Sequence, residues 1–347
     1  MSKRSRFLCS MVVFVFILML LLSFLQEVLA RKSLTHPWDM TNKIGGFYNE
    51  PEDEFEVMFF GSSHAYASFS PLELWEEAGG VKSYVFATQR QPPWATYIYI
   101  KEAMKTQSFS LAVVECNMFL DDKEYYTDGV NHSCCDDIPF TWNKVRLAWE
   151  LSPDLEGKMS LLFNFIKYHG RWNELNWDDF FFDRNKVRDA YKGFVMLEQN
   201  SDETQWQPDI GDITETMPLC DKQQYWLDEI IKLCEEEGVD LWLVKSPSNL
   251  SQEQKKLLNS VEEKAYQNNI PFYDFNMCYE DIGINGDYFY DRGHLDALGA
   301  SKFTRYFANV LMEELPGLKR ESDDTGWAEA LNTYKAELSQ YEWPDSP

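Results

Sequence analysis

Short apolar runs alternate with segments of helical periodicity over two stretches of the chain. The strand-like runs are 56–60, 83–87 and 111–115 in the first stretch, and 239–245 and 271–275 in the second. The segments with helical periodicity are 71–78, 94–104, 222–238 and 297–315, with a further helix between the last two strands. Strands that alternate with helices predict a parallel five-stranded sheet covered on both faces, with ligands at the carboxyl ends of the strands.

This alternation stops between the two stretches, where the composition changes to large aromatic residues such as Trp172 and Trp177. We interpret 121–219 as a mainly helical insertion that caps the sheet edge. The predicted organisation is an N-terminal segment 1–30, a linker 31–54, two halves of one α/β domain at 55–120 and 220–316, and a polar C-terminal tail 317–347 with one amphipathic helix at 327–341.

The N-terminal segment predicts a membrane anchor. Residues 7–25 form a run without a charge, and about 20 helical residues cross a bilayer. Lys3, Arg4 and Arg6 precede the run, so the N-terminus is expected in the cytoplasm and the remainder outside. The residues 28–30 (VLA) also fit a signal-peptide cleavage site, but a cleaved apolar region has typically about 7–15 residues, which favours a retained anchor. The chain is exported in both cases.

Charge and cysteine usage exclude several classes. The 57 acidic and 32 basic side chains give a net charge of -25, which repels phosphate backbones, so nucleic acid is not an expected partner. The seven cysteines include no CxxC pair, and no EF-hand spacing occurs, so we expect no metal and no cofactor.

Two short motifs contain candidate catalytic residues. Gly61-Ser62-Ser63-His64 directly follows the first strand, where a serine hydroxyl is exposed beside backbone N–H groups that can bind an oxyanion. Asp291 and His294 lie on one loop before the last helix, and a carboxylate-oriented imidazole is the base that a nucleophilic serine requires. The pair of motifs predicts a serine nucleophile, although each alone is more often an ordinary turn or loop.

These motifs, with Gly299 five residues after His294, resemble the SGNH (GDSL-type) hydrolase superfamily, and the chain is most similar to its membrane-anchored envelope proteins of teichoic acid D-alanylation and alginate-type O-acetylation. The resemblance implies a flavodoxin-like three-layer α/β/α sandwich and metal-free ester hydrolysis or acyl transfer. It makes Ser63 the nucleophile, His294 the base and Asp291 its orienting partner.

The resemblance also implies an oxyanion hole. Asn117, after the third strand, corresponds to the family's asparagine, although it fits a cap of the following turn equally well. Arg90 stands near the position of the family's glycine, and its backbone N–H, like that of Ser63, is an expected donor. A glycine would matter there only if the backbone needs a positive φ.

Further residues are expected to bind substrate: His64, Gln91, His169, Arg171 and Trp172. His64 could also be a rival base, and the cluster 168–172 fits core packing as well as sugar or carboxylate recognition. The sequence thus predicts an anchored serine esterase or O-acyltransferase that acts on acyl esters, with O-acetyl on envelope polysaccharide favoured. An integral membrane acyl donor protein is a partner implied by the resemblance alone. The competing prediction is an inactive protein of the same fold that binds glycan or organises an assembly.

Overall fold

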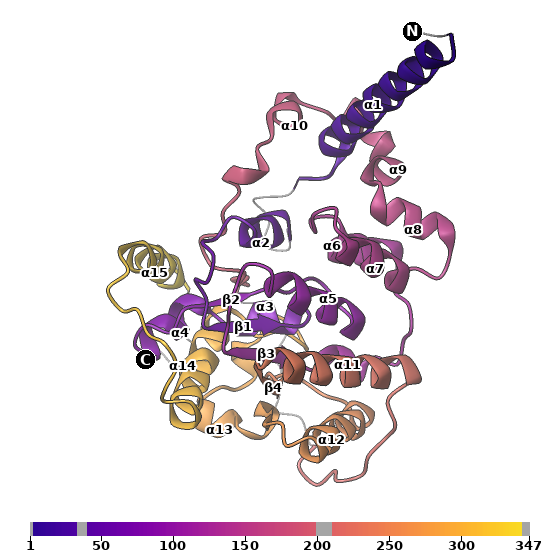
Figure 1. Ribbon diagram of the computed structural model, residues 1–347. Coiled ribbons are helices and arrows are strands. Elements are labelled where there is room, and N and C mark those ends of the chain that lie inside the picture. The colour runs from indigo at the N-terminus through magenta and orange to yellow at the C-terminus, as the bar shows by residue number, and fades with distance from the viewer. Residues whose placement is uncertain (1–2, 33–39, 199–209, 342–347) are drawn as a thin grey trace.

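A five-stranded sheet forms the centre of the computed structural model, which describes residues 3–32, 40–198 and 210–341. All neighbouring strands are parallel, in the order β2-β1-β3-β4-β5 (Figure 1). The strands are β1 (Val57–Phe60), β2 (Ser83–Val85), β3 (Leu111–Glu115), β4 (Asp240–Lys245) and β5 (Phe272–Asp274). The predicted parallel α/β fold is confirmed, because each predicted strand is present within two residues of its expected ends.

Helices cover both faces of this sheet, as right-handed crossovers between parallel strands require. One face carries α5 (Pro93–Ala103), α11 (Asp221–Glu237) and α12 (Gln252–Gln267) (Figure 1). The other carries α4 (Pro71–Glu77) and α14 (Ala297–Glu314). The chain leaves β1 towards β2 on one side, whereas β3 lies on the other side of β1, so a crevice opens at the carboxyl ends of β1 and β3.

The apolar run of β1 is the middle of the core. All four of its residues are buried, as expected for a parallel strand covered on both faces. Phe59 stacks on Phe69 with ring centroids 4.3 Å apart, and Phe307 of α14 packs edge-on against Phe59 at 5.7 Å. Helix α14 is therefore fixed to the same strand whose end carries the Gly-Ser-Ser turn.

In the described part of the aromatic-rich region between β3 and α11, all the regular secondary structure is helical. It contains α6 (Asp128–Cys135), α7 (Trp142–Leu151), α8 (Leu155–Leu162), α9 (Asn164–Tyr168) and α10 (Trp177–Phe181), with short 3-10 turns η2 (His169–Asn173) and η3 (Arg184–Lys186). Its last part lies along the edge strand β2, where the Val85 N–H donates to the Lys192 carbonyl at 2.9 Å. A Cβ on Gly193 would lie 1.9 Å from the Val85 oxygen, so only glycine permits this close approach.

The flanking segments contain two helices that pack on the domain, one within the expected linker and one close to the amphipathic helix expected at 327–341. Within the expected linker 31–54, residues 40–47 form helix α2 (Met40–Phe47), and Phe47 stacks on Phe86 at 4.1 Å. In the expected polar tail, helix α15 (Thr325–Leu338) buries Trp327 and Tyr334 against the domain. Residues 33–39 and 342–347 of these segments lie outside the described parts of the chain.

The N-terminal helix α1 (Lys3–Leu29) projects from the domain (Figure 1). It is long and apolar enough to span a membrane, with a mean hydropathy of 2.9. Its C-terminal end packs against α9 and α10.

Asp296 caps the N-terminus of α14 from a buried position. Its Oδ1 accepts a hydrogen bond from the Gly299 N–H at 2.7 Å. Burial raises the pKa of this carboxyl to about 6, against the opposing effect of the backbone N–H groups. The folded protein therefore binds this proton more tightly than the unfolded chain does. The ionised carboxylate costs stability increasingly as the pH rises from about 4 to about 6, and it costs the full amount above that window.

Replacement Asp296→Asn keeps a capping oxygen and removes the buried charge. We expect the free energy of unfolding of the full chain in detergent to rise by about 1–2 kcal/mol at about pH 8 and to change little at about pH 4. Chemical denaturation at both pH values measures it. Asp154, which caps α8 through Gly157 at 2.7 Å in an exposed position, provides the matched control Asp154→Asn, which removes a capping charge that is not buried. An equal effect at both pH values would contradict this account of Asp296.

Candidate active site

A sharp turn after β1 places Ser63 at the edge of the sheet. Gly61 has φ +140°, and a Cβ there would lie 3.0 Å from the Cβ of Glu115 on β3. Glycine thus allows the turn to pass directly beside β3. Ser62 is the N-cap of the short helix α3 (Ser63–Ser68), so Ser63 is its first residue.

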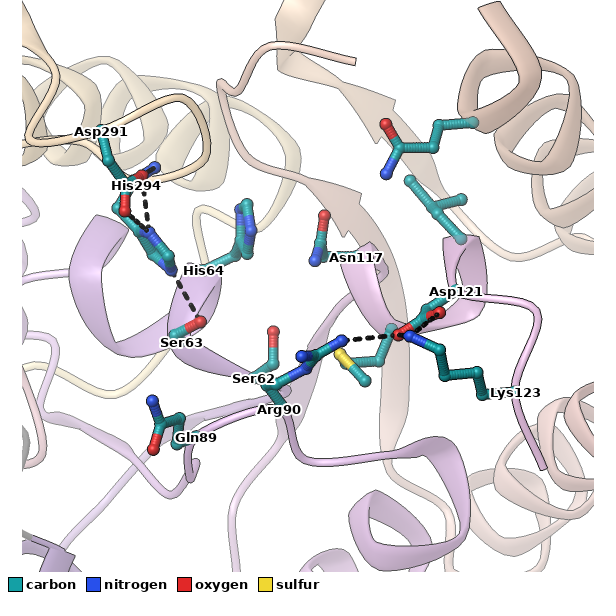
Figure 2. Close-up of a pocket in the computed structure, with 13 residues that line it drawn as sticks. Ser62, Ser63, His64, Gln89, Arg90, Asn117, Asp121, Lys123, Asp291 and His294 are labelled. Carbon is teal, nitrogen blue, oxygen red and sulfur yellow. Dashed lines mark hydrogen bonds and ion pairs between the residues drawn. The ribbon is translucent and has the colours of Figure 1, made fainter. Parts of the chain in front are cut away.

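The structure brings Ser63, His294 and Asp291 together (Figure 2). His294 Nε2 lies 2.7 Å from Ser63 Oγ, although the two residues are 231 positions apart in the sequence. On its other side, His294 Nδ1 lies 2.8 Å and 3.0 Å from the two Asp291 oxygens. A hydrogen-bonded chain therefore runs from a carboxylate through an imidazole to a hydroxyl, the arrangement that activates a serine.

Asp291 is held in its ionised form. Burial opposes ionisation, but the hydrogen bond and charge of His294 and the backbone N–H groups of Gly293 and His294 outweigh it and lower the pKa of the carboxyl. The Asp291 Oδ1 accepts from those N–H groups at 2.7 Å and 2.9 Å. An ionised Asp291 favours the tautomer in which Nδ1–H donates to it and Nε2 accepts the proton of Ser63.

Asn117 faces the same pocket from the next strand along the sheet (Figure 2). It begins the 3-10 turn η1 (Asn117–Leu120) directly after β3. Its backbone N–H donates to Glu115 Oε2 at 3.0 Å, and in the described residues its side-chain amide makes no hydrogen bond to the turn. This observation favours the oxyanion interpretation over the structural cap.

A fully buried ion pair lies beneath Asn117. Glu115 Oε1 accepts from Lys245 Nζ at 2.9 Å and from Ser246 Oγ at 3.2 Å, and both charged side chains are inaccessible to solvent. A buried pair of this kind is costly unless its lone pairs are satisfied, and here the bonds from Asn117 and Ser246 satisfy them. The pair thereby fixes the ends of β3 and β4 below the pocket.

Arg90 has a backbone conformation that glycine adopts without strain. Its φ is 52°, in the left-handed region, which costs a residue with a Cβ about 1–2 kcal/mol. The backbone therefore meets the condition under which a glycine would matter at this position. The Arg90 side chain extends along the pocket and pairs with Asp121 at 3.0 Å (Figure 2).

His64 lies between His294 and Asn117 (Figure 2), and its ring centroid is 4.7 Å from that of His294. Burial, aided by the charges of Lys245 and His294, lowers its pKa well below the ordinary value, so the imidazole is neutral. A Cβ on Gly293 would lie 3.2 Å from His64 Cε1 and Nε2, so the glycine of the Asp291–His294 loop leaves room for this ring. Because Ser63 is bonded to His294, His64 is not the base that the geometry favours.

These groups line a pocket of about 670 Å³. Its wall contains most of the predicted site together with residues that the sequence did not indicate. The lining residues are Ser62, Ser63, His64, Gln89, Arg90, Asn117, Met118, Leu120, Asp121, Lys123, Gln254, Asp291 and His294.

Four residues that we expected to bind substrate lie elsewhere. Gln91 is fully buried and bonds to Thr88 and Thr96, so it stabilises the turn before α5. His169, Arg171 and Trp172 lie on η2 near the C-terminal end of α1, away from the pocket lining. Arg171 donates to the carbonyls of that helix end, because a guanidinium is a suitable partner for the unsatisfied carbonyls of a helix terminus.

Sequence reasoning missed two further features of the site. The side chain of Tyr66 interacts with Ser63, and burial raises the pKa of its phenol well above the ordinary value. Tyr66 is one helical turn after the serine, so the 3.6-residue period of α3 was an available signal. The pair of Glu115 and Lys245 also had a signal in the sequence, because each is a charged residue at the end of an otherwise apolar strand. Charged side chains are rarely buried without a partner, so two such residues on buried strands suggest an ion pair.

Within residues 3–32, 40–198 and 210–341, one group of carboxylates is close enough to share a cation: Glu73, Glu76 and Glu77 on α4. It is not part of the pocket lining, and Arg305 pairs with Glu73 and Glu77.

Comparison with known proteins adds little to this site. No protein-family model matches the chain, and no curated protein matches its sequence. Among solved structures, the chain is similar to a "putative acylhydrolase" from Bacteroides fragilis NCTC 9343, with 11% sequence identity over 78% of this chain and 95% of that one and a TM-score of 0.39. A likeness this distant carries no argument about activity.

Proposed function

We propose that this protein is an extracytoplasmic, membrane-anchored serine esterase or O-acyltransferase of the SGNH type. The observation that carries the proposal is the unbroken hydrogen-bonded chain from Asp291 through His294 to Ser63 at the wall of an open pocket. An inactive binding protein of the same fold has no need for this alignment of three side chains from two distant segments.

The reaction proceeds by two acyl transfers. Ser63 Oγ attacks the ester carbonyl while His294 Nε2 accepts its proton, and the ionised Asp291 stabilises the resulting imidazolium. The tetrahedral intermediate collapses to an acyl-serine, and His294 returns the proton to the leaving alcohol. Water or a sugar hydroxyl then attacks the acyl-serine by the same steps, which gives hydrolysis or O-acyl transfer respectively.

Three donors are suited to the oxyanion. The first N–H groups of a helix have no acceptor within it, so the Ser63 N–H at the start of α3 is available. The Asn117 amide faces the same pocket, and the Arg90 N–H is the third candidate. His64, as a neutral imidazole in the pocket wall, contacts the substrate as a donor and not as the base.

The N-terminal helix is retained as an anchor in this proposal, with its basic end in the cytoplasm and the α/β domain outside. The buried positions of Val28, Leu29 and Ala30 support retention, because a cut after Ala30 would remove packed residues from the folded protein. Arg171 donates to the Leu29 carbonyl at 3.0 Å, so the insertion is built around an intact helix end.

The substrate that we propose is an acyl ester of an envelope polysaccharide, with O-acetyl as the acyl group. The pocket is within the size range of small-molecule sites, about 300–1,000 Å³, and it has mixed polar groups on its wall. In the transferase form, an integral membrane acyl donor protein would supply the acyl group beside the anchor.

Removal of the Ser63 hydroxyl tests the proposal. Replacement Ser63→Ala is expected to lower acyl release from a p-nitrophenyl ester by at least about 1,000-fold, because the nucleophile acts as a unit with His294 and Asp291. Labelling by a fluorophosphonate probe should be lost as well. The melting temperature should stay nearly unchanged, since a turn serine contributes little packing.

The matched control is Ser83→Ala, which removes a buried hydroxyl at the start of β2, at the opposite end of the sheet from the pocket. It is expected to keep full activity and labelling. An unlabelled wild-type protein, under conditions that label a known serine esterase, would overturn the catalytic proposal.

The contact between Gly293 and His64 gives a second test. In Gly293→Ala the new methyl group must displace the His64 ring or the loop that holds His294, so we expect the rate of ester hydrolysis to fall by about 10–100-fold. Gly170→Ala, where a Cβ meets nothing within 4 Å, is the control without effect.

Gly293→Ala in a His64→Ala background tests whether the loss of rate comes from the contact between the new methyl group and the His64 ring. Without the ring, the methyl group has space, so Gly293→Ala should then reduce the rate much less than it does in the wild type. An undiminished loss in that background would show that the glycine serves the loop for another reason.

A further inference from the structure

Several hydrogen bonds and ion pairs join the C-terminal end of α1 to the insertion. Arg171 bonds to the Leu29 carbonyl and to Asp179, at 3.0 Å and 3.1 Å, and Lys32 donates to the Glu27 carbonyl at 2.6 Å. Arg184 pairs with the Glu27 side chain at 2.6 Å. Cations that satisfy the last carbonyls of a helix also interact favourably with its dipole, so this joint holds α1 at a fixed angle to the domain.

Large aromatic side chains are exposed on the segments that form this joint. Trp172 on η2 is 73% exposed, and Trp177 and Phe181 on α10 are 77% and 76% exposed. The rings of Trp177 and Phe181 stack 6.0 Å apart, and Phe180 lies 6.3 Å from Phe24 of α1. These residues, Trp172, Trp177, Phe180 and Phe181, form one aromatic collar around the base of α1.

The position of the collar along α1 indicates what covers it. The apolar run of α1 ends at Leu25, before Gln26 and Glu27, so with α1 across a bilayer the residues that follow lie at the level of the lipid headgroups. Both η2 and α10 contact the C-terminal part of α1, through Leu29 and Phe24 respectively, and α10 lies beside that part of α1 in Figure 1, which places the collar at the same level. Tryptophan and other aromatic side chains are enriched at that level because their rings are amphipathic.

We propose that the aromatic collar docks into the outer headgroup region of the bilayer as a second membrane contact, which fixes the orientation of the domain. This proposal rests on the anchor part of the proposed function and is independent of the catalytic part. The chain has a net charge of -25, so burial of aromatic surface, and not attraction to anionic lipid, drives the contact. The collar therefore binds a zwitterionic bilayer.

Site-specific photo-cross-linking tests the docking. Benzoylphenylalanine replaces Trp177 or Phe181 in the full chain, which is purified and reconstituted in phosphatidylcholine nanodiscs. Both positions are exposed aromatics, so the substitution preserves the fold. We expect irradiation to give covalent adducts with the phospholipid at each position, detected by mass spectrometry of the peptide.

Two further positions complete the experiment. Tyr266 is 84% exposed on α12, a helix that lies far from α1 in Figure 1, and it is the matched control that should give no lipid adduct. Benzoylphenylalanine at Phe14 in α1 tests whether this helix lies in the bilayer, and it should give a lipid adduct. Adducts at Phe14 without adducts at Trp177 and Phe181 would overturn the docking and leave the anchor standing.

The remaining outcomes are equally decisive. No adduct at Phe14 would overturn both the anchor and the docking, whereas the Ser63 tests would be unaffected. Cross-links from Trp177 or Phe181 to a second copy of the chain, in place of lipid, would show a protein interface and contradict the proposal.

Discussion

The hydrogen bond between His294 Nε2 and Ser63 Oγ is the contact on which the proposed chemistry depends, and it joins two segments that only the complete sheet brings together. Ser63 is fixed by β1, while His294 is fixed by the loop before α14. The stacking of Phe59 on Phe69 and the contact of both rings with Phe307 of α14 connect these two supports through the core. The core thus sets the distance between the hydroxyl and the imidazole.

Glycines and buried charges determine the positions of the other side chains around this hydrogen bond. Gly61 lets the turn pass beside β3, and Gly293 leaves room for the neutral ring of His64. The buried pair of Glu115 and Lys245 holds the ends of β3 and β4 under Asn117. Polar groups held by a rigid, poorly solvated framework need little reorganisation during a reaction, which is the physical basis of electrostatic stabilisation at such sites.

Sequence patterns were sufficient for the sheet and for the two motifs. Buried parallel strands are short apolar runs, and the two motifs lie next to regular elements, with Ser63 at the start of α3 and His294 three residues before α14. Sequence patterns were insufficient where the role of a residue depends on which groups surround it in the folded chain. Arg171 was expected to bind substrate but caps α1, since sequence does not tell which helix end a guanidinium will meet. Gln91 turned inward although its neighbours line the pocket. Helix α2 lies within the segment expected to be a linker, although the spacing of Ile44 and Phe47 fits one face of a helix.

The most direct measurement of the central claim is the identification of the covalent intermediate. The full chain is mixed with an activated acetyl ester, quenched in acid after a single turnover, and digested, and the acetylated residue is located by mass spectrometry. We expect one acetyl group on Ser63, and we expect that this adduct does not accumulate in His294→Ala. An acetyl group on another residue would contradict the role of Ser63 as nucleophile. Turnover without any adduct on Ser63, under conditions that slow deacylation, would contradict it as well.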